Sequence, residues 1–219
     1  MKAIVCADIN WGIGKGTGML FHIPADLKFF KEKTMGSTVI MGRTTFLSLP
    51  GQKALPGRKN IVLTRDENWS AENVMVCHGI DELADIISSD EKVFLIGGEA
   101  VYGELIDACN EAFVTRVNAA GGAEKFFPDL DARAGWKLVE RSAAQESNGY
   151  VFTFDRYVKN KLYETGFDGL TANPVFCFIR SGRTFFGSLI KDLFLRYRRS
   201  CRNMHKQSVR HLEILTREK

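Results

Sequence analysis

A carboxylate on a predicted helix is the first group in this sequence that could do chemistry. Pro24 suits the first turn of a helix, which predicts a helix through PADLKFFKEKTM at 24–35. Asp26 and Leu27 lie four and three residues before Phe30, so all three share one helical face. A carboxylate can accept two hydrogen bonds from the N–H groups of a flat heterocycle while apolar side chains cover the ring. Because the helix macrodipole alone also favours an Asp in the first turn, both interpretations stay open.

A pair of glycines lies between a predicted strand and a predicted helix, in VFLIGGEAVY at 93–102. Without side chains at Gly97 and Gly98, a pyrophosphate could approach the first N–H groups of the helix, where the helix dipole favours negative charge. A tight turn that needs a positive φ angle would select the same residues. The full GxGxxG fingerprint is absent, so the pair does not establish a nucleotide site.

Basic side chains follow two other predicted strands, STVIMG at 37–42 and KNIVLT at 59–64. Arg43 and Arg65 come directly after these strands, and such cations at the carboxyl ends of strands can hold a second phosphate, such as the 2′-phosphate of NADPH. Solvated surface charge is the alternative for each of them. Arg58, in LPGRKN, could bind a substrate carboxylate in a forked geometry. The hydroxyl groups that accompany the two strands are Thr44, Thr45 and Thr64.

Length and composition indicate a globular protein. The chain has 219 residues, 45% hydrophobic and 26% charged, which is enough for one buried core with or without a small appended unit. The first residues lack the pattern of a secretory signal, and no apolar run approaches the roughly 20 residues of a membrane-spanning helix. The five cysteines are scattered without a CxxC pair, which indicates reduced thiols in a cytoplasmic protein. We therefore expect neither disulfides nor a metal site.

The net charge of +4 is unevenly distributed. Residues 160–219 contain 12 basic and 5 acidic residues, a net charge of +7, whereas residues 1–159 contain 18 basic and 21 acidic residues, a net charge of −3. The basic character thus belongs to the C-terminal segment, and nothing predicts nucleic-acid binding by the mildly acidic main part.

The elements that would position these groups alternate between strands and helices. Buried strands are predicted at 2–8, 37–42, 59–64, 73–77 and 92–98, and helices at 24–35, 43–49, 80–87 and 99–106. Longer, alternating strands are predicted at 111–118, 136–143 and 150–158. The glycine-rich stretch 10–20 is expected to be a mobile loop. This order predicts an α/β fold with a single mainly parallel sheet, an antiparallel C-terminal edge and flanking helices.

Five blocks, in order and without a large gap, resemble the motif series of the dihydrofolate reductases. They are NWGIG at 10–14, PADLKFFK at 24–31, VIMGRTT at 39–45, LPGRKNIVLT at 55–64 and IGGEAVY at 96–102, followed by FFPD at 126–129. The resemblance extends from residue 1 to about residue 158. It implies NADPH-dependent reduction of 7,8-dihydrofolate to tetrahydrofolate, with hydride transfer to C6 and protonation at N5.

The resemblance implies roles on the substrate side. Asp26 matches the acid that binds the 2-amino group and N3 of the pterin and favours protonation of N5 through its charge and a bound water. Thr115 matches the threonine that orients this acid, and Arg58 matches the residue that binds the glutamate α-carboxylate of the substrate. The other implied substrate contacts are the apolar walls Leu27, Phe30 and Leu49, the carbonyls of Ile4 and Ile96, and Tyr102.

The resemblance also implies a set of cofactor contacts. The nicotinamide contacts correspond to Ala7, Ile13 and Gly14, and Tyr102 touches the reactive end. Residues 14–21 correspond to a mobile lid that excludes water during the transfer. The remaining positions along the NADPH site are Met19, Gly42, Arg43, Thr44, Thr45, Leu63, Thr64, Arg65, Gly97, Gly98, Glu99, Ala100 and Val101.

Two positions depart from the family pattern. Phe21 stands where the family usually has a tryptophan whose indole N–H holds a water near the substrate. We expect weaker proton delivery or an altered inhibitor fit, with activity retained. Ala100 stands where some members have an arginine near the cofactor phosphates, so Arg43 and Arg65 are expected to carry more of the preference for NADPH.

A basic extension follows a domain boundary predicted near Lys159, which separates residues 1–159 from residues 160–219. Its segment 184–200 places six apolar residues on one helical stripe with basic residues at the end. Such a helix could bind a membrane surface, nucleic acid or a partner protein, or pack against a second subunit. The main domain is expected to be a monomer. The residues of the stripe are Phe186, Leu189, Ile190, Leu193, Phe194 and Tyr197.

Two rival functions remain open at this point. A related reductase of riboflavin biosynthesis reduces a ribosylated pyrimidine with NADPH, but it would not require Asp26 together with Arg58. A binding or assembly protein that acts through its C-terminal extension on a reductase scaffold would not need to retain Asp26, Thr115 and Arg58.

Overall fold

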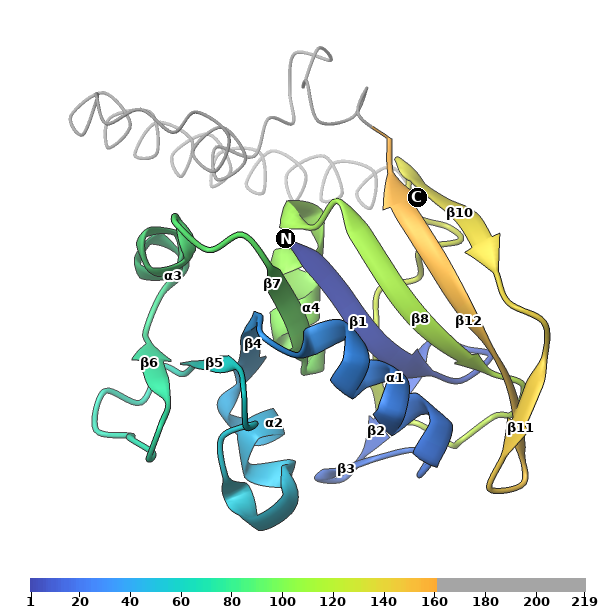
Figure 1. Cartoon of the computed structure of the whole chain (residues 1–219), viewed down its shortest axis with the longest axis horizontal. Helices are drawn as coiled ribbons and strands as arrows, with labels where there is room; N and C mark the ends of the chain where they lie inside the picture. The colour runs from blue at the N-terminus through green and yellow to red at the C-terminus, as the bar shows by residue number, and fades with distance from the viewer. Residues whose placement is uncertain (161–219) are drawn as a thin grey trace, which may run out of the picture. The chain divides into compact units, whose positions relative to one another are not determined.

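The computed structural model describes residues 1–160, which Figure 1 shows as ribbons coloured along the chain. The strands are β1 (Lys2–Ala7), β2 (Gly12–Lys15), β3 (Gly18–Met19), β4 (Thr38–Gly42), β5 (Lys59–Leu63), β6 (Met75–Cys77), β7 (Val93–Gly97), β8 (Glu111–Val117), β9 (Lys125–Phe126), β10 (Trp136–Arg141), β11 (Gln145–Ser147) and β12 (Tyr150–Lys159). The helices are α1 (Pro24–Thr34), α2 (Arg43–Ser48), α3 (Ile80–Ile87) and α4 (Glu99–Leu105), with short 3-10 helices at Pro50–Gln52 and Ile106–Ala108. The helical stripe predicted at 184–200 lies outside the described residues.

One mixed sheet forms the frame of the domain. Its strand order is β10-β12-β8-β1-β7-β4-β5-β6, and β11 pairs with β12. The neighbouring strands from β8 to β6 are parallel, whereas β12 is antiparallel to β8, β10 and β11. The predicted α/β fold, with a mainly parallel sheet and an antiparallel edge formed by the C-terminal strands, is confirmed.

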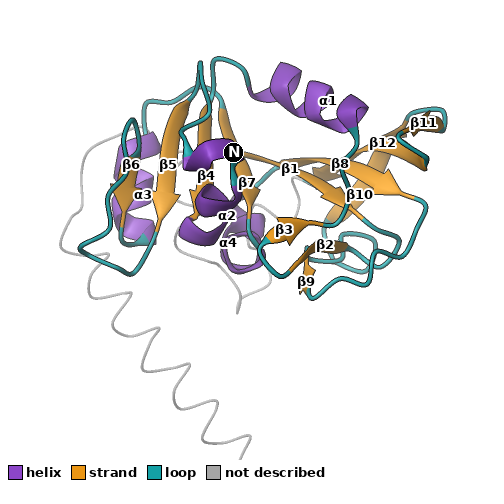
Figure 2. Ribbon diagram, turned by 90° about the horizontal axis from the view of Figure 1, so that it is seen from below, coloured by secondary structure: helices purple, strands orange, loops and turns teal. Residues whose placement is uncertain are grey.

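Helices cover both faces of this sheet, which explains why its central strands are apolar throughout. Three successive residues of β4, Val39, Ile40 and Met41, are fully buried. Val39 and Met41 belong to a cluster that receives aromatic side chains from α1 and α2. Ile40 faces the other way, into a cluster with residues of α3 and α4. Figure 2 shows α1 and α4 on opposite sides of the sheet.

Helix α1 begins where its sequence predicts and ends one residue before the predicted end. Pro24 is its first residue, and the backbone becomes extended again at Met35. Gly36 then adopts a φ of 71°, which favours glycine, and its N–H donates to the carbonyl of Gly57 at 2.9 Å. The chain is thereby held just after the C-terminal end of the helix, and Asp26 lies in the first turn.

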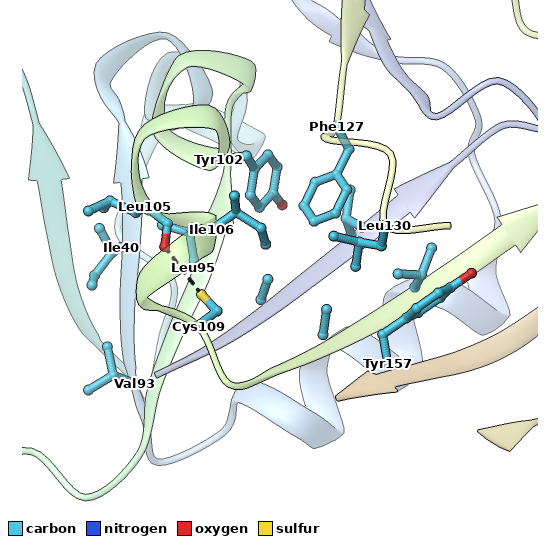
Figure 3. Packing of buried hydrophobic residues seen from close by; sticks show 14 of the residues in the cluster. Ile40, Val93, Leu95, Tyr102, Leu105, Ile106, Cys109, Phe127, Leu130 and Tyr157 are labelled. Carbon is cyan, nitrogen blue, oxygen red and sulfur yellow. Dashed lines mark hydrogen bonds between the residues drawn. The ribbon is translucent and has the colours of Figure 1, made fainter. Parts of the chain in front are cut away.

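An aromatic cluster closes the α4 side of the sheet. Figure 3 shows the ring of Tyr102 beside that of Phe127, with Leu130 and Tyr157 further along. The centroids of Tyr102 and Phe127 are 4.6 Å apart in an edge-to-face arrangement. Trp11 stacks on Phe127 at 5.9 Å and meets Tyr157 edge-on at 5.8 Å. This cluster packs the chain that leads into β2 against the core.

The glycine-rich stretch 10–20 is more regular than its composition predicts. Strands β2 and β3 form a hairpin, and β2 also pairs with β9, which gives a second, three-stranded sheet. A Cβ atom at Gly12 would lie 2.3 Å from the Cβ of Ala123, so the glycine permits the two segments to approach closely. Here the glycine permits a close contact between two backbone segments. Composition alone does not distinguish such a glycine from one in an irregular loop.

Within residues 1–160, no helix is long and apolar enough to cross a membrane. In the same range, no group of three or more His, Cys, Asp and Glu side chains is placed to hold a metal ion. The cysteines in this part of the chain, Cys6, Cys77 and Cys109, are free thiols.

Candidate active site

Asp26 and Thr115 form a hydrogen-bonded pair between helix α1 and strand β8. The Thr115 hydroxyl donates to Oδ1 of Asp26 at 2.6 Å. Thr115 is 1% exposed, whereas Asp26 is only partly covered. No described residue donates to Oδ2 of Asp26, so this oxygen remains available to accept hydrogen bonds from a ligand.

The environment of Asp26 favours its protonated form. Burial raises the pKa of the carboxyl above its ordinary value, and the hydrogen bond from Thr115 opposes part of the rise. A partly buried carboxylate also raises the proton affinity of a base beside it, because its charge is poorly screened there. The pair can therefore bind the N–H groups of a heterocycle and assist protonation of a ring nitrogen.

The two neighbouring phenylalanines of α1 have different environments. Phe29 stacks on Phe154 with ring centroids 4.2 Å apart and belongs to the core packing. Phe30 is only partly buried, and Leu27 is 38% exposed. Leu49, after α2, packs partly buried against the same cluster. Leu27, Phe30 and Leu49 are thus at least partly exposed and available to cover a ligand. Phe29 is partly buried as well, but its ring packs against Phe113 and Phe154.

Strand β1 places alternate residues on opposite faces. Ile4 packs with residues of α1, and Cys6 packs with residues at the start of that helix. Ala7 is fully buried in the cluster on the other face. The β1–β8 register pairs Cys6 with Thr115, and burial together with the nearby Asp26 raises the pKa of the Cys6 thiol. Cys6 is missing from the predicted contacts, although the alternation that starts at Ile4 points to it.

Tyr102 links helix α4 to strand β1. Its hydroxyl donates to the carbonyl of Ile4 at 2.6 Å, and the residue is 2% exposed. Burial raises the pKa of Tyr102 well above its ordinary value, so the hydroxyl stays protonated. The Ile4 carbonyl keeps a second lone pair for a ligand. Ile96, partly buried on β7, packs against the same cluster as Ile4.

Arg58 is held beside the apolar face of α1. Its Nε donates to the carbonyl of Pro56 and its Nη1 to the hydroxyl of Thr34, each at 3.1 Å. The guanidinium carbon lies 5.8 Å from the ring centroid of Phe30. Among the described residues, no acceptor meets Nη2 of Arg58, which therefore remains free to bind a carboxylate.

Three of the predicted cofactor segments lie side by side at the carboxyl ends of β7, β4 and β5. The register pairs Met41 with Gly97 and Gly42 with Leu63. Helices α2 and α4 begin directly after Gly42 and Gly98, and no side chain caps either N-terminus. Ligands of open α/β sheets bind at this edge.

The glycine pair packs closely against α2. A Cβ atom at Gly98 would lie 3.0 Å from Oγ1 of Thr45, and one at Gly97 would lie 3.3 Å from the same side chain. The peptide bond between the glycines is cis, and Gly97 has a φ of 138°, which disfavours any side chain. The bare backbone at this edge fits the close approach of a pyrophosphate.

The two arginines near this edge differ in their partners. Arg43 forms an ion pair with Asp66 at 2.5 Å, and both side chains are about 40% exposed. Arg65 is exposed, and none of the described carboxylates pairs with it. Thr64 accepts a hydrogen bond from the Asp66 N–H at 3.2 Å. Exposed or partly exposed positions of α2 and α4 hold the other predicted contacts, Thr44, Ala100 and Val101.

The predicted lid is hydrogen-bonded to strand β9 and to Glu124, the residue just before that strand. The N–H of Glu124 donates to the carbonyl of Gly14, and the N–H of Gly16 donates to Oε2 of Glu124, each at 2.9 Å. At the other end of β9, the N–H of Phe126 donates to Oε1 of Glu99 at 2.9 Å, at the start of α4. Glu124 is therefore a further functional candidate that the motif blocks do not include.

Phe21 lies in a buried cluster at the end of the predicted lid. It is 8% exposed, and its ring meets that of Tyr150 edge-on at 5.0 Å. A Cβ atom at Gly121 would lie 3.1 Å from its Cζ, so the backbone of that loop covers the ring closely. Of the other predicted contacts in this segment, Ile13 is partly buried and Met19 is 62% exposed.

Comparisons with known proteins show which family the chain resembles. The family model described as dihydrofolate reductase matches residues 1–159. The dihydrofolate reductase of Neisseria gonorrhoeae is 36% identical over 154 residues, which cover 70% of this chain and 93% of that protein. The enzyme of Bacillus subtilis (strain 168) is 34% identical over 165 residues, which cover 74% of this chain and 96% of that protein.

A solved structure gives the same result. Dihydrofolate reductase from Enterococcus faecalis, complexed with NADP(H) and RAB-propyl, matches with a TM-score of 0.66 and 36% identity, over 73% of this chain and 95% of that one. The chain belongs to the dihydrofolate reductase family.

Proposed function

We propose that residues 1–159 reduce 7,8-dihydrofolate to 5,6,7,8-tetrahydrofolate with NADPH. The observation that carries the proposal is the Asp26–Thr115 pair, with its 2.6 Å hydrogen bond and its raised carboxyl pKa, in a chain of this family. The names of the relatives and the NADP(H) in the Enterococcus faecalis structure support it.

On the substrate side, Asp26 accepts hydrogen bonds from the 2-amino group and N3 of the pterin through its free oxygen. Its charge raises the proton affinity of N5, where a proton must arrive as C6 accepts the hydride. Leu27, Phe30 and Leu49 cover the substrate, and Nη2 of Arg58 binds the carboxylate of its glutamate. Thr115 positions the acid and does not touch the reacting atoms.

On the cofactor side, NADPH when bound supplies the hydride. The backbone at Gly97 and Gly98, kept bare beside Thr45, binds the pyrophosphate, and Arg65 with Arg43 binds the 2′-phosphate that distinguishes NADPH from NADH. Residues 14–21, held by Glu124, exclude water from the nicotinamide.

The test is the loss of NADPH absorbance with dihydrofolate, measured on the full chain and on residues 1–159. Both should turn over, and Asp26→Asn should be at least about a hundredfold slower at neutral pH, the usual effect of a positioned acid–base group. Absence of turnover by the full chain would contradict the proposal. Turnover of a ribosylated pyrimidine in its place would favour the riboflavin-pathway alternative, which receives no support from the family match.

The remaining parts of the proposal concern organisation. The family model ends at residue 159, near the change in charge, and this supports a reductase domain followed by a separate basic extension. We also propose that the domain is a monomer and, on the basis of its free thiols, that it is cytoplasmic. Whether residues 160–219 contact a partner protein, a second subunit, nucleic acid or a membrane surface is tested by the salt dependence of binding, which is steep for a basic segment on a polyanion.

A further inference from the structure

Asp8, just after β1, is a buried carboxylate that none of the roles above uses. It is 2% exposed. Its Oδ1 accepts hydrogen bonds from the N–H groups of Asn10, at 2.8 Å, and Gly12, at 2.7 Å. Its Oδ2 accepts one from the N–H of Gly121, at 3.0 Å. A single side chain thus joins the loop before β2 to a loop more than a hundred residues later.

The hydrogen-bond donors to the Asp8 carboxylate within residues 1–160 are backbone N–H groups, and no cation there forms an ion pair with it. Burying a carboxylate is costly unless its oxygens are hydrogen-bonded. The two oxygens serve different loops, so each loop is needed to satisfy the charge. The carboxylate therefore connects the two loops through hydrogen bonds and does not stabilise one loop alone.

Other contacts place the two loops against each other. The N–H of Ile9 donates to the carbonyl of Ala119 at 3.2 Å. Gly12 leaves no room for a side chain, since a Cβ there would meet Ala123 at 2.3 Å. Trp11 lies between Asp8 and Gly12 with a positive φ of 64°, which is uncommon for a large side chain. Trp11 thus has an uncommon backbone conformation, and the residues on either side of it, Asn10 and Gly12, both donate hydrogen bonds to Asp8.

The second loop lies against the far end of the predicted lid. A Cβ atom at Gly121 would lie 2.8 Å from Cδ1 of Leu20 and 3.1 Å from Cζ of Phe21, so the backbone at Gly121 packs directly on these residues. Strand β2, which leads into the lid of residues 14–21, begins at Gly12. Asp8 therefore bonds to a residue two positions before the lid and to the loop that packs on Leu20 and Phe21 at its end.

We propose that Asp8 is a positioning residue for hydride transfer, which fixes both ends of segment 12–21 relative to each other through its two oxygens. This rests on the proposed function, because residues 14–21 within this segment are taken to close over the reacting rings. Asp8 does not touch substrate or cofactor. Its loss should leave substrate binding largely intact and should lower the fraction of time in which the segment excludes water.

The test uses Asp8→Asn in the full chain, because asparagine keeps the size of the side chain and has one acceptor oxygen. The amide oxygen can keep the two bonds to Asn10 and Gly12, while the amide N–H₂ then faces the Gly121 N–H, and two donors cannot pair. We expect amide hydrogen exchange at Gly121 to become about tenfold faster or more, the factor that one hydrogen bond is worth. Exchange at Gly12 should change less.

The functional readout separates positioning from binding. We expect single-turnover hydride transfer to fall about tenfold in Asp8→Asn, while the KM for dihydrofolate changes less than about twofold. The matched control is Asp85→Asn, which makes the same chemical change at an exposed position of α3 and should alter neither quantity.

Two results would overturn the proposal: unchanged hydride transfer in Asp8→Asn with Gly121 exchange accelerated, or unchanged exchange at Gly121. If Asp8→Asn does not fold, amide hydrogen exchange is measured on the wild-type protein instead. Equally strong protection of the Gly12 and Gly121 amides is expected, and rapid exchange at Gly121 would contradict its hydrogen bond to Asp8. Failure of the proposed function would appear separately, as lack of turnover by the wild-type chain, and would leave the exchange experiment interpretable.

Discussion

The hydroxyl of Thr115 donates to Oδ1 of Asp26 across 2.6 Å and joins strand β8 to helix α1, two elements 89 residues apart in the chain. The bond occupies one carboxylate oxygen and leaves the other for a ligand. It also opposes the rise in the Asp26 pKa that burial causes. Thr115 therefore sets both the orientation and the proton affinity of the acid.

Replacing Thr115 by valine tests this relationship, because valine has nearly the same shape and no donor. Loss of the bond should raise the pKa of Asp26 further, so the midpoint of the pH profile of hydride transfer should move to higher pH. We expect kcat/KM for dihydrofolate to fall about tenfold, as for a lost hydrogen bond to a charged group. Thr115→Ser, which keeps the hydroxyl, should behave nearly as the wild type does. An equal loss in both variants would assign the effect to packing.

Asp26→Asn should make the protein more stable at neutral pH. The folded-state pKa of Asp26 is raised, so between its ordinary value near 3.8 and the folded value the folded state binds more protons than the unfolded state does. Wild-type stability therefore falls as pH rises through this window, whereas asparagine does not titrate. Urea unfolding of both proteins from pH 4 to pH 8 should show a stability difference that grows toward neutral pH, and a constant difference would contradict the assigned cause.

Activity of the same variant should depend on pH in a distinct way. At neutral pH, Asp26→Asn is expected to lose about a hundredfold or more in hydride transfer, because no charge assists protonation of the ring nitrogen. At low pH, solvent supplies the proton, so part of the rate should return. A pH-independent deficit would indicate that Asp26 acts only in binding.

Arg58 is positioned by a residue that has no contact with the ligand in the proposed site. Thr34 is fully buried and accepts from Nη1 of Arg58, so Thr34→Val removes the acceptor at nearly constant volume. We expect the KM for dihydrofolate to rise several-fold in Thr34→Val and about tenfold or more in Arg58→Leu, with kcat little changed in both. Thr34→Ser is the control. A fall in kcat at unchanged KM would contradict the binding role of Arg58.

The sequence predicted the frame of the fold well, because the frame depends on local patterns. The apolar runs in β4 and β7 and the proline that opens α1 are visible along a few residues. Contacts between distant segments are not visible in this way. The pairing of β2 with β9 and the hydrogen bond between Asp8 and Gly121 both join residues more than a hundred positions apart. A glycine that permits such a contact cannot be distinguished by composition from a glycine in a loop.

The direction of side chains along a strand is a second feature that the resemblance did not predict. The resemblance implies that residues of β1 belong to the site, but it does not state which of Cys6 and Ala7 faces helix α1. The structure places Cys6 on that side and buries Ala7 on the other. Because side chains alternate along a strand, Ile4 and Cys6 must share one face and Ala7 must lie on the other. Matching positions to a family identifies the strand but does not say which face each side chain occupies.

The preference for NADPH should depend more on Arg65 than on Arg43. Arg43 is paired with Asp66, and Arg65 has no such carboxylate partner among residues 1–160. We expect Arg65→Ala to lower the ratio of NADPH to NADH kcat/KM about tenfold or more, and Arg43→Ala to lower it less. Asp66→Asn releases Arg43 and should raise the ratio. If Arg43→Ala has the larger effect, the ion pair opens when the cofactor binds and Arg43 is the main phosphate ligand.

Phe21→Trp tests whether the missing indole donor limits proton delivery. Phe21 is 8% exposed and confined between Tyr150 and the backbone at Gly121, so the larger ring must extend out of this cluster or disturb its packing. An indole N–H that reaches the proposed substrate site would hold a water there, and the pH profile of hydride transfer should then shift. Phe21→Leu, which changes bulk without adding a donor, separates packing from hydrogen bonding. A shift in Phe21→Trp that Phe21→Leu does not reproduce is the expected result, and an unchanged profile in Phe21→Trp would show that proton delivery in this enzyme does not need a donor at this position.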